Sequence, residues 1–307
     1  MGGRRVPNWL QWLFRIAFTV GVTWIIARQV GVGLDDALAL DRGVPELRPV
    51  PMGASILVLL LAFGFAARLW GWMVRELGGR DPGALASARI ILTANLGRYI
   101  PGKVWQLAGV AVLSRRAGIA ASTGTLSALL VQGFALTATA AWGIPVLADN
   151  ELRIALAVAA ALLILASIPP VSRTGFRILF RLARRDPDEA PRTGPGFGPR
   201  WLAWHGILWG VYGLAFHWFM MGLGFDIGFG TAAVSFAAAY LLGYLALPAP
   251  AGIGVREGVL LALLQPHIGA AAAPVAILAR LWMTVVELVP AGILAGWEAL
   301  RRPGEEE

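Results

Sequence analysis

The segment TANLGRYIPGKVWQLAG, residues 93–109, interrupts an apolar run with Pro101 and Gly102 and places Arg98 and Lys103 on either side of them. Proline and glycine break a helix, because proline lacks the amide hydrogen and glycine favours irregular backbone. A charged side chain is costly wherever its surroundings are apolar. The meaning of this break therefore depends on whether the flanking apolar runs lie in a soluble core or in a membrane.

The composition of the chain indicates a membrane. Apolar residues make up 57% of the 307 residues, and charged residues make up 14%. Soluble domains contain about 45–50% apolar residues, and several segments here reach the roughly 17–25 apolar residues that a helix needs to cross a bilayer. The sequence predicts an all-α polytopic membrane protein. The net charge of +8 is then typical of basic loops at a membrane surface and does not indicate nucleic-acid binding.

About six full membrane-spanning helices are expected. The first has a basic start that resembles a signal peptide, but no small-residue cleavage site follows its apolar run, so we expect it to remain. Two further apolar segments, residues 85–113 and 231–264, are broken by proline and glycine, and each side of the break is too short to cross alone. The full spans are expected at residues 9–27, 52–74, 123–147, 152–168, 201–222 and 274–300.

Arginine placement predicts how the broken segments are oriented. Both flanks of residues 85–113 are rich in arginine, which the positive-inside rule places in the cytoplasm together with both termini. This segment must then enter and leave on the same side, as a re-entrant helical hairpin. Residues 231–264 start on the outer side and return to it, so they predict a second hairpin of opposite orientation. The expected tips are Pro101 and Gly102 in the first hairpin, and Pro248, Pro250, Gly252 and Gly254 in the second.

The two halves of this single predicted domain are expected to be inverted repeats. In each half a full span, a hairpin and another full span follow one another. Residues 1–170 form the first half and residues 201–307 the second, joined by a cytoplasmic linker over residues 171–200 that is rich in arginine, proline and glycine. Both breaks follow a Leu-Gly pair, which ends at Gly97 and at Gly243. Inverted repeats are a recurring transporter design, with the substrate site between broken helices near the bilayer midplane.

The cations beside the breaks are candidate ligands for an anion. Helix N-termini that begin inside the bilayer present free amide groups and the positive end of the helix dipole. Arg98 and Lys103 flank the first tip, and Arg256 follows the second. An ammonium suits a phosphate, and a guanidinium forks onto two oxygens; the alternative is that these cations reach lipid headgroups and only fix the hairpin depth. We favour phosphate binding, with Tyr99 and Gln106 as further candidates to line the site and core packing as their alternative.

Three more charged residues lie at membrane depth. Glu257 follows Arg256, and Glu287 lies within the last span, seven residues after Arg280 and on the same helical face. Such charges are costly in a membrane and are functional candidates for that reason. The alternative is an internal ion pair of Glu257 or Glu287 with Arg256 or Arg280. We include Glu257, Arg280 and Glu287 in the candidate substrate site with both roles open.

Several kinds of chemistry are excluded or disfavoured. The chain has no cysteine, which excludes disulfides, thiolate metal sites and thiol nucleophiles. His205 and His217 lack metal-binding spacing, and interfacial packing among tryptophans is expected for both. The stretch GIGVREG lacks the Lys-Ser pair of a nucleotide-binding loop and follows no strand. We therefore expect no metal, no cofactor and no nucleotide motor. Tyr240 and Tyr244 fit a cavity lining or a packed core equally well.

The stretches NLGRYIPGKVWQLAGVAVLSRRAGI and PAPAGIGVREGVLLALL together resemble the lysylphosphatidylglycerol synthase transmembrane-region family, also called the flippase-like domain family. Its typical motifs are a YxPGKxW-like stretch in the first half and a proline- and glycine-rich stretch that ends in Arg-Glu-Gly in the second. Ala251 stands where such sequences often have glycine. The matching residues are Tyr99, Pro101, Gly102, Lys103 and Trp105, and Pro250, Gly252, Gly254, Arg256, Glu257 and Gly258.

The resemblance implies a polytopic membrane protein that moves lipids between leaflets. Two-part members add a soluble aminoacyl-transferase domain that makes the lipid, and residues 1–307 do not include one, so synthase activity is not expected. The cargo is then not fixed as lysylphosphatidylglycerol, because members without that domain are implied to serve glycolipids or polyprenyl-phosphate carriers as well.

The leading hypothesis is a lipid flippase of the plasma membrane that is not an enzyme. It would move an anionic phospholipid or a polyprenyl-phosphate-linked lipid through a cavity between the two hairpins. One alternative is a membrane-embedded transferase or phosphatase that acts on a lipid phosphate, with Glu257 or Glu287 as the base. Another is a non-transporting scaffold for a glycosyltransferase. The expected partners are the membrane, a lipid with a phosphate headgroup, and a lipid-modifying enzyme or glycosyltransferase.

Overall fold

The computed structural model describes residues 47–99, 104–143, 196–246 and 252–301, together with isolated positions between 154 and 194. Every regular element in these residues is a helix, as predicted. The expected spans at residues 9–27 and 152–168 and the linker at residues 171–200 lie outside the described residues, wholly or for the most part. Four of the predicted hairpin-tip residues also lie outside them, namely Pro101, Gly102, Pro248 and Pro250.

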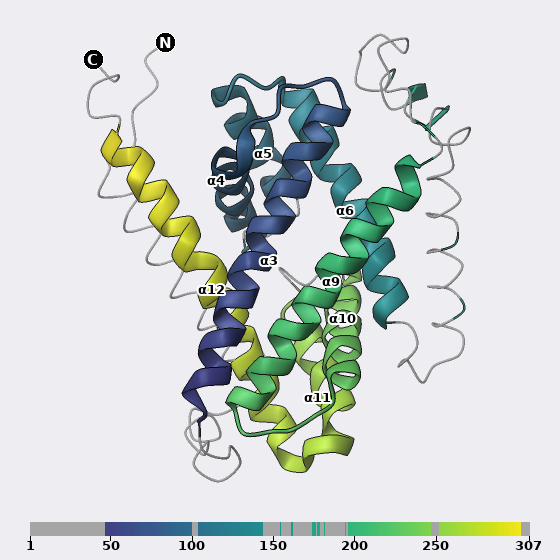
Figure 1. The fold of residues 1–307 in the computed structure, drawn as a ribbon, viewed down its shortest axis with the longest axis vertical. Coiled ribbons are helices and arrows are strands. Elements are labelled where there is room, and N and C mark those ends of the chain that lie inside the picture. The colour runs from purple at the N-terminus through teal and green to yellow at the C-terminus, as the bar shows by residue number, and fades with distance from the viewer. Residues whose placement is uncertain are drawn as a thin grey trace.

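Four long helices frame the molecule, and their bounds agree with four of the predicted spans to within a few residues (Figure 1). Among the described residues, three helical segments are long and apolar enough to cross a membrane: two of these long helices, and a segment that runs over Val255–Leu294. The remaining long helix contains several tryptophans and glycines and two histidines. The long helices are α3 (Pro49–Glu76), α6 (Ala121–Gly143), α9 (Phe197–Gly222) and α12 (Ala272–Arg301).

Each predicted broken segment is a pair of short helices on either side of a break. The first pair lies in the upper part of the view in Figure 1 and the second in the lower part. The observed bounds differ from the predicted ones by only a few residues. The first pair consists of α4 (Gly83–Asn95), the 3-10 turn η2 (Leu96–Tyr99) and α5 (Val104–Arg116); the second consists of α10 (Phe229–Leu245) and α11 (Val255–Ile268), followed by η6 (Gly269–Ala271).

An ion pair fixes the turn between α3 and α4. Arg68 on α3 donates two hydrogen bonds to the carboxylate of Asp81, at 2.6 and 2.5 Å, and the backbone N–H of Gly83 donates a third at 2.9 Å. The Arg68 guanidinium lowers the pKa of Asp81 to about 2, so the carboxylate is charged at neutral pH. The start of the first helix pair is therefore tied directly to a long helix.

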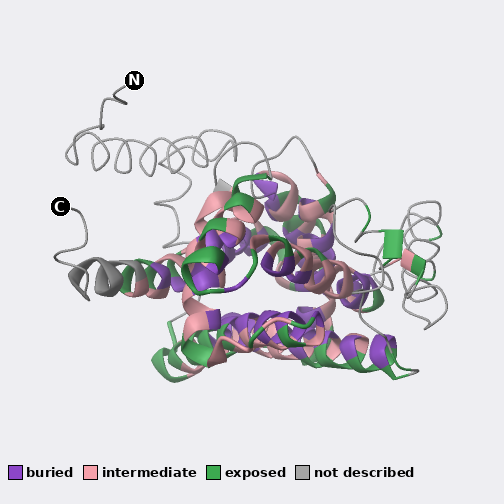
Figure 2. Ribbon diagram, turned by 90° about the horizontal axis from the view of Figure 1, so that it is seen from above, coloured by how far each residue is buried: buried purple, intermediate pink, exposed green. Residues whose placement is uncertain are grey.

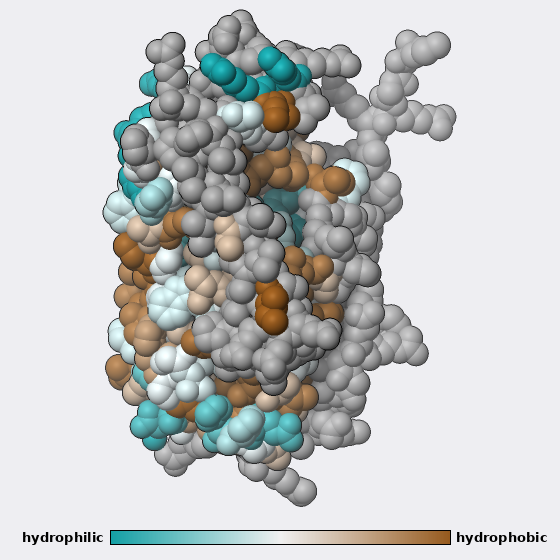
Figure 3. Space-filling view, turned by 90° about the vertical axis from the view of Figure 1, so that its right-hand side faces the viewer, coloured by the Kyte–Doolittle hydropathy of each residue, from teal (hydrophilic) through white to brown (hydrophobic). Residues whose placement is uncertain are grey.

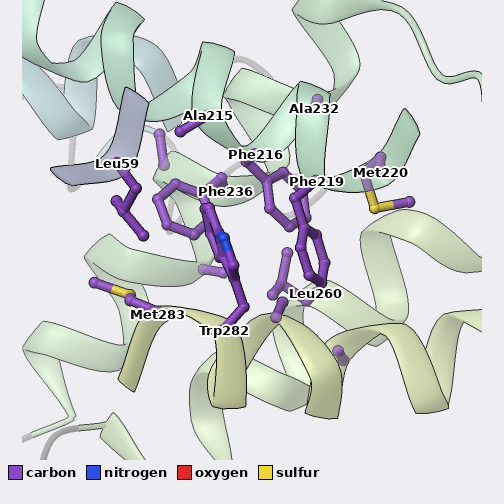
Figure 4. Close-up of a cluster of buried hydrophobic side chains, with 14 of the residues drawn as sticks. Leu59, Ala215, Phe216, Phe219, Met220, Ala232, Phe236, Leu260, Trp282 and Met283 are labelled. Carbon is purple, nitrogen blue, oxygen red and sulfur yellow. The ribbon is translucent and has the colours of Figure 1, made fainter. Parts of the chain in front are cut away.

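The core is densest where α9, α10 and α12 meet. Phe216 stacks on Phe236 with ring centroids 5.0 Å apart, and Phe219 stacks on Trp282 at 4.8 Å. Figure 4 shows these four rings, from three helices, pointing into one cluster beside Leu59 of α3. Aromatic pairs of this kind contribute about 0.5–1.5 kcal/mol beyond the area they bury. The cluster holds α12 against α9 and α10.

Small residues let the helices of the second pair approach their neighbours closely. A Cβ atom on Gly143 of α6 would lie 2.7 Å from the backbone nitrogen of Ala238 on α10, and one on Gly213 of α9 would overlap Ala233. Close contacts through glycine and alanine are typical of helix packing in membranes, where tight van der Waals contact replaces the hydrophobic effect. α10 is therefore packed between α6 and α9.

The outer faces of the bundle are apolar. Val285, Val289 and Ile293 of α12 are 55%, 55% and 65% exposed, and their four-residue spacing places them in one stripe. Buried residues lie between the helices and exposed ones on their outward faces (Figure 2). On the face in Figure 3, hydrophilic residues gather near the two ends of the long axis and hydrophobic residues lie between them. This distribution is the one expected of a protein embedded in a bilayer.

Candidate functional site

A cavity of about 250 Å³ lies where the two helix pairs meet the four long helices. Residues from both pairs and from all four long helices line it, and most of them are apolar or aromatic. The polar residues come from different helices, so only the tertiary fold brings them together. They include Asn95, Arg98, Gln106, Gln132, Tyr240 and Arg256.

The first break positions Arg98. A Cβ atom on Gly97 would lie 2.7 Å from backbone atoms of Trp105 and Gln106, so glycine is needed for the first turn of α5 to pack against η2. Nη1 of Arg98 lies 3.3 Å from Oε1 of Glu287 on α12. The Glu287 side chain is 1% exposed and the Arg98 side chain 20%. This pair was not among the ion pairs expected for Glu287, and it leaves the guanidinium in the cavity lining while the carboxylate is buried.

The second break depends on glycine conformation and on a helix cap. Gly252 and Gly254 have φ angles of +72° and +83°, in the left-handed region that other residues rarely adopt. A Cβ atom on Gly252 would also lie 2.7 Å from the carbonyl oxygen of Gly243. Gly254 is the N-cap of α11, and its N–H donates a 2.7 Å hydrogen bond to Oε2 of Glu257. The glutamate thus satisfies a backbone donor at the start of α11.

Glu257 also pairs with Arg280. Oε1 of Glu257 lies 3.7 Å from Nε of Arg280, and both side chains are 6% exposed. This is one of the ion pairs that the sequence left open as an alternative to substrate binding. The pair joins α11 to α12 and does not line the main cavity, but both members line a smaller pocket of about 20 Å³ that shares Arg256 with it. Of the predicted site residues, Glu257, Arg280 and Glu287 are therefore buried partners in ion pairs, whereas Arg98, Gln106, Gly252 and Arg256 line the cavity.

Arg256, the second residue of α11, lines the cavity beside the second break. Its Cζ lies 4.2 Å from the ring centroid of Tyr240, and Nη1 lies 3.8 Å from Sδ of Met283. A Cβ atom on Gly243 would overlap the Arg256 side chain, so the glycine leaves room for it. A cation over an aromatic face is attracted by the ring quadrupole. These two contacts orient the guanidinium.

Neutral polar groups complete the lining. Nε2 of Gln106 on α5 donates a 2.7 Å hydrogen bond to Oδ1 of Asn95 on α4, which ties the two arms of the first pair together. Gln132 on α6 has a buried amide nitrogen without a hydrogen-bond partner in the described part of the chain. Among these residues the sequence singled out only Gln106 as a site candidate.

The sequence reasoning missed Tyr212, and it left Tyr240 and Tyr244 undecided. All three line the cavity. A compositional signal was available, because the chain has 4 tyrosines against 13 tryptophans and 13 phenylalanines, and the remaining one, Tyr99, directly follows Arg98. Tyrosine is the aromatic residue that adds a hydroxyl to a packing surface. Its concentration at one cavity therefore indicates a polar role there.

His205 differs from its predicted setting. It packs beside Trp201 and Phe134, as expected of an aromatic-rich helix, but its side chain is fully buried and borders the cavity. Its Nδ1 donates a 2.8 Å hydrogen bond to the carbonyl oxygen of Trp201. Lys103 and the side chain of Tyr99, both predicted site residues, lie outside the described part.

The arrangement suits a group that carries two or more anionic oxygens. Two guanidiniums, one from each break, line a small and largely apolar cavity, and a guanidinium binds best to a group with two or more anionic oxygens. Ligand pockets for drug-sized molecules run from about 300 to 1,000 Å³, so a cavity of about 250 Å³ suits a small polar group better than a whole lipid. Within the described residues, no three histidine, aspartate or glutamate side chains gather as a metal site.

One comparison with known proteins identifies a relationship. A family model described as the lysylphosphatidylglycerol synthase TM region matches residues 12–291, nearly the whole chain and both breaks. No curated protein and no solved structure matches the chain.

Proposed function

The chain belongs to the lysylphosphatidylglycerol synthase transmembrane-region family, and from this premise we propose that it moves a lipid with an anionic headgroup between the two leaflets of the membrane. The family supports a role connected with membrane lipids. The cavity supports the more specific role, because it has the size and the charge for a phosphate headgroup. In this proposal the protein is a flippase of the plasma membrane, with both termini in the cytoplasm, and it is not an enzyme.

One observation carries the proposal: Arg98 from the first break and Arg256 from the second line the same cavity. Charged side chains are rare within membrane segments, and those that occur mark substrate paths or internal ion pairs. The Glu257–Arg280 pair joins two helices, and neither member lines this cavity. Arg98 and Arg256 lie where a bound group could reach both.

The helix pairs supply the moving parts of the proposed mechanism. The pairs α4–η2–α5 and α10–α11 lie toward opposite ends of the molecule (Figure 1), and we take them as re-entrant hairpins of opposite orientation within inverted repeats. Gly97 and Gly243 fit this correspondence, because each lets the following helix approach its break closely. In transporters built this way, one repeat rocks against the other around a site near the midplane, so that the site opens to each side in turn.

The headgroup phosphate would compete with the Glu287 carboxylate for the guanidinium of Arg98. Glu287 now lies 3.3 Å from that guanidinium, so a carboxylate occupies one side of it. A phosphate that enters the cavity brings more anionic oxygens, which the forked guanidinium can bind in pairs. Its hydrocarbon chains stay in the bilayer, because the cavity has no room for them. Transport in this scheme needs no nucleotide and follows a gradient of the lipid.

The test is transport in liposomes that contain the purified full chain. Tail-labelled phosphatidylglycerol reports movement between leaflets by chemical quenching from outside. We expect Arg256→Gln to slow transport at least tenfold, because it removes a guanidinium from the cavity. Arg115→Gln is the matched control, since Arg115 is exposed at the end of α5 and does not line the cavity.

The result that contradicts the proposal is undiminished transport by a correctly folded Arg256→Gln protein. The enzymatic alternative is tested in the same preparation, because hydrolysis or transfer of the labelled headgroup would appear as a new lipid product. Transport without such a product supports the flippase.

A further inference from the structure

The lining of the cavity is least buried on the side that α5 and α6 supply. Leu129 of α6 is 48% exposed, and every other described residue of the lining is less exposed. Leu107 of α5 is partly exposed and belongs to the same lining. By contrast, Phe63 and Trp70 of α3 are 5% and 1% exposed, so this part of α3 forms a closed wall. Leu129 therefore borders both the cavity and the outside of the bundle.

The helices α5 and α6 separate as they leave the short turn that joins them. Near the turn they touch, because a Cβ atom on Gly124 of α6 would overlap the side chain of Ser114 on α5. Counting away from that contact in opposite directions places Val110 opposite Ala128. From these two positions onward, residues of both helices line the cavity. The space between α5 and α6 is therefore part of the cavity.

This opening lies at the depth of lipid tails. Arg115 and Arg116 are exposed at the end of α5, where a boundary between membrane and water is expected. Leu107 lies nine residues before Arg116, and Leu129 lies eight residues after Ala121, where α6 begins. At about 1.5 Å per residue these separations are about 14 and 12 Å along the helices, and a tilt of about 40° still leaves about 10 Å. Half of the hydrocarbon layer is about 15 Å thick, so both helices place the opening within it.

The rim of the opening is apolar, as that depth requires. Val104 and Trp105 at the start of α5 are 65% and 50% exposed, and Leu107 and Leu129 carry hydrocarbon side chains. Exposed apolar side chains that gather at one place mark a surface that meets lipid or a partner. The amide of Gln106 belongs to the cavity lining and is less exposed than Leu129. The polar lining therefore begins behind an apolar rim.

We propose that the space between α5 and α6 is a lateral opening through which the tails of a bound lipid extend from the cavity into the bilayer, past Leu107 and Leu129. This rests on the proposed function and names the position of its cargo. A cavity of about 250 Å³ suits a small polar group better than a whole lipid, so the tails of a bound lipid must leave it. An apolar opening within the hydrocarbon layer lets them leave without contact with water. A soluble phosphate compound would have to cross that layer to use it.

The tails can be located with a single thiol, because the chain has no cysteine. Leu129→Cys carries a fluorophore at the rim, and Val289→Cys is the matched control on an exposed apolar position of α12 that does not line the cavity. Each labelled protein is placed in phosphatidylcholine liposomes that contain either phosphatidylglycerol or phosphatidylcholine with a nitroxide quencher on the tail, at equal mole fraction.

We expect quenching at position 129 to be at least twofold stronger with the phosphatidylglycerol quencher, because tails of bound lipid extend there. At position 289 the two quenchers should act equally. Equal quenching by the two lipids at position 129 overturns the proposal, and so does the same preference at position 289.

A larger side chain at the rim tests whether the opening is used. Leu129→Trp narrows it and should slow the transport of tail-labelled phosphatidylglycerol at least fivefold. Val289→Trp adds the same ring to the outer face of α12 and should leave the rate unchanged. An unchanged rate in a folded Leu129→Trp protein overturns the proposal. If that variant does not fold, the quenching measurement decides.

The two measurements separate this inference from the proposed function. Preferential quenching at position 129 without transport keeps the lateral opening and overturns the flippase. Transport without preferential quenching keeps the flippase and overturns the lateral opening. Neither preferential quenching nor transport overturns both.

Discussion

The two breaks in the chain perform the same task by different means. The first break is tied to a distant helix, because Arg98 faces Glu287 on α12 and Asp81 anchors the start of α4 to α3. The second is fixed by its own residues, through two left-handed glycines and the Glu257 cap, and also by the pair of Glu257 with Arg280 on α12. A helix that ends inside a membrane must satisfy its free backbone groups locally or within the protein. Among the described residues, both breaks reach α12 through an ion pair, and the second adds a local cap and two left-handed glycines.

The largest expected difference concerns glycine. Gly252→Ala places a side chain at φ +72° and 2.7 Å from the carbonyl oxygen of Gly243. The backbone conformation costs about 1–3 kcal/mol and the overlap about 1–3 kcal/mol more. Gly97→Ala meets only the overlap, so it should lose about half as much free energy of unfolding. Gly53→Ala, with open space around it, should change little.

Denaturant unfolding in detergent micelles measures these three losses. An equal loss of unfolding free energy for Gly97→Ala and Gly252→Ala would contradict the expected difference between the two breaks.

The next effect concerns the two buried carboxylates. Glu257→Gln keeps an oxygen for the N–H of Gly254 but removes the carboxylate that lies 3.7 Å from Arg280, which is 6% exposed. Removing one member of a buried pair costs about 3–5 kcal/mol. Glu287→Gln should cost less, about 1–3 kcal/mol, because Arg98 is 20% exposed and can be solvated from the cavity. Thermal unfolding of the two variants measures which loses more stability. A greater loss for Glu287→Gln would show that the Arg98–Glu287 pair contributes more than the Glu257–Arg280 pair.

A smaller effect on lipid binding is expected from the tyrosine ring beside Arg256. Tyr240 lies under the Arg256 guanidinium, and a partly exposed cation–π contact is worth about 1 kcal/mol. Tyr240→Leu should therefore weaken binding of phosphatidylglycerol about fivefold, measured by titration. Tyr240→Phe keeps the ring and should retain most of the affinity. If Leu and Phe weaken binding equally, the ring does not orient Arg256 and the hydroxyl matters instead.

The smallest effect concerns the anchor of the first pair. Asp81→Asn should lower the free energy of unfolding by about 1 kcal/mol at pH 7, because a partly exposed ion pair contributes little. The folded-state pKa of Asp81 is lowered from 3.8 to about 2, so its contribution is present above pH 3.8 and is lost as the pH falls through about 2. The difference between the two proteins should be constant from pH 5 to pH 8, by thermal unfolding. A difference that grows on acidification would contradict this assignment.

The sequence predicted the parts of this fold that depend on local chemistry. Apolar length predicted α3, α6 and α12, and proline and glycine predicted where both helix pairs break, because these residues act on their own backbone. The membership of the family was predicted from the same motifs. The Arg98–Glu287 pair could not be predicted, since it joins residues far apart in the chain through the packing of α12. Sequence periodicity likewise says little about a helix that is apolar on all sides.

The candidate site was predicted in part. Arg98, Gln106 and Arg256 line the cavity because each lies beside a break, which local reasoning can see. Tyr212 and His205 lie on a continuous helix, α9, where nothing in the local pattern distinguishes a cavity position from a packed one. Sequence analysis also grouped Glu257 with the cavity cations, whereas the cap geometry at Gly254 turns it toward Arg280.

The small size of the cavity has a consequence for physiology. In the proposed function, a recess of about 250 Å³ would receive only the headgroup of a lipid and would not distinguish the length, branching and saturation of its tails. A cell that remodels its fatty acids when the temperature changes would therefore keep the same cargo for this protein without altering a single residue of the site.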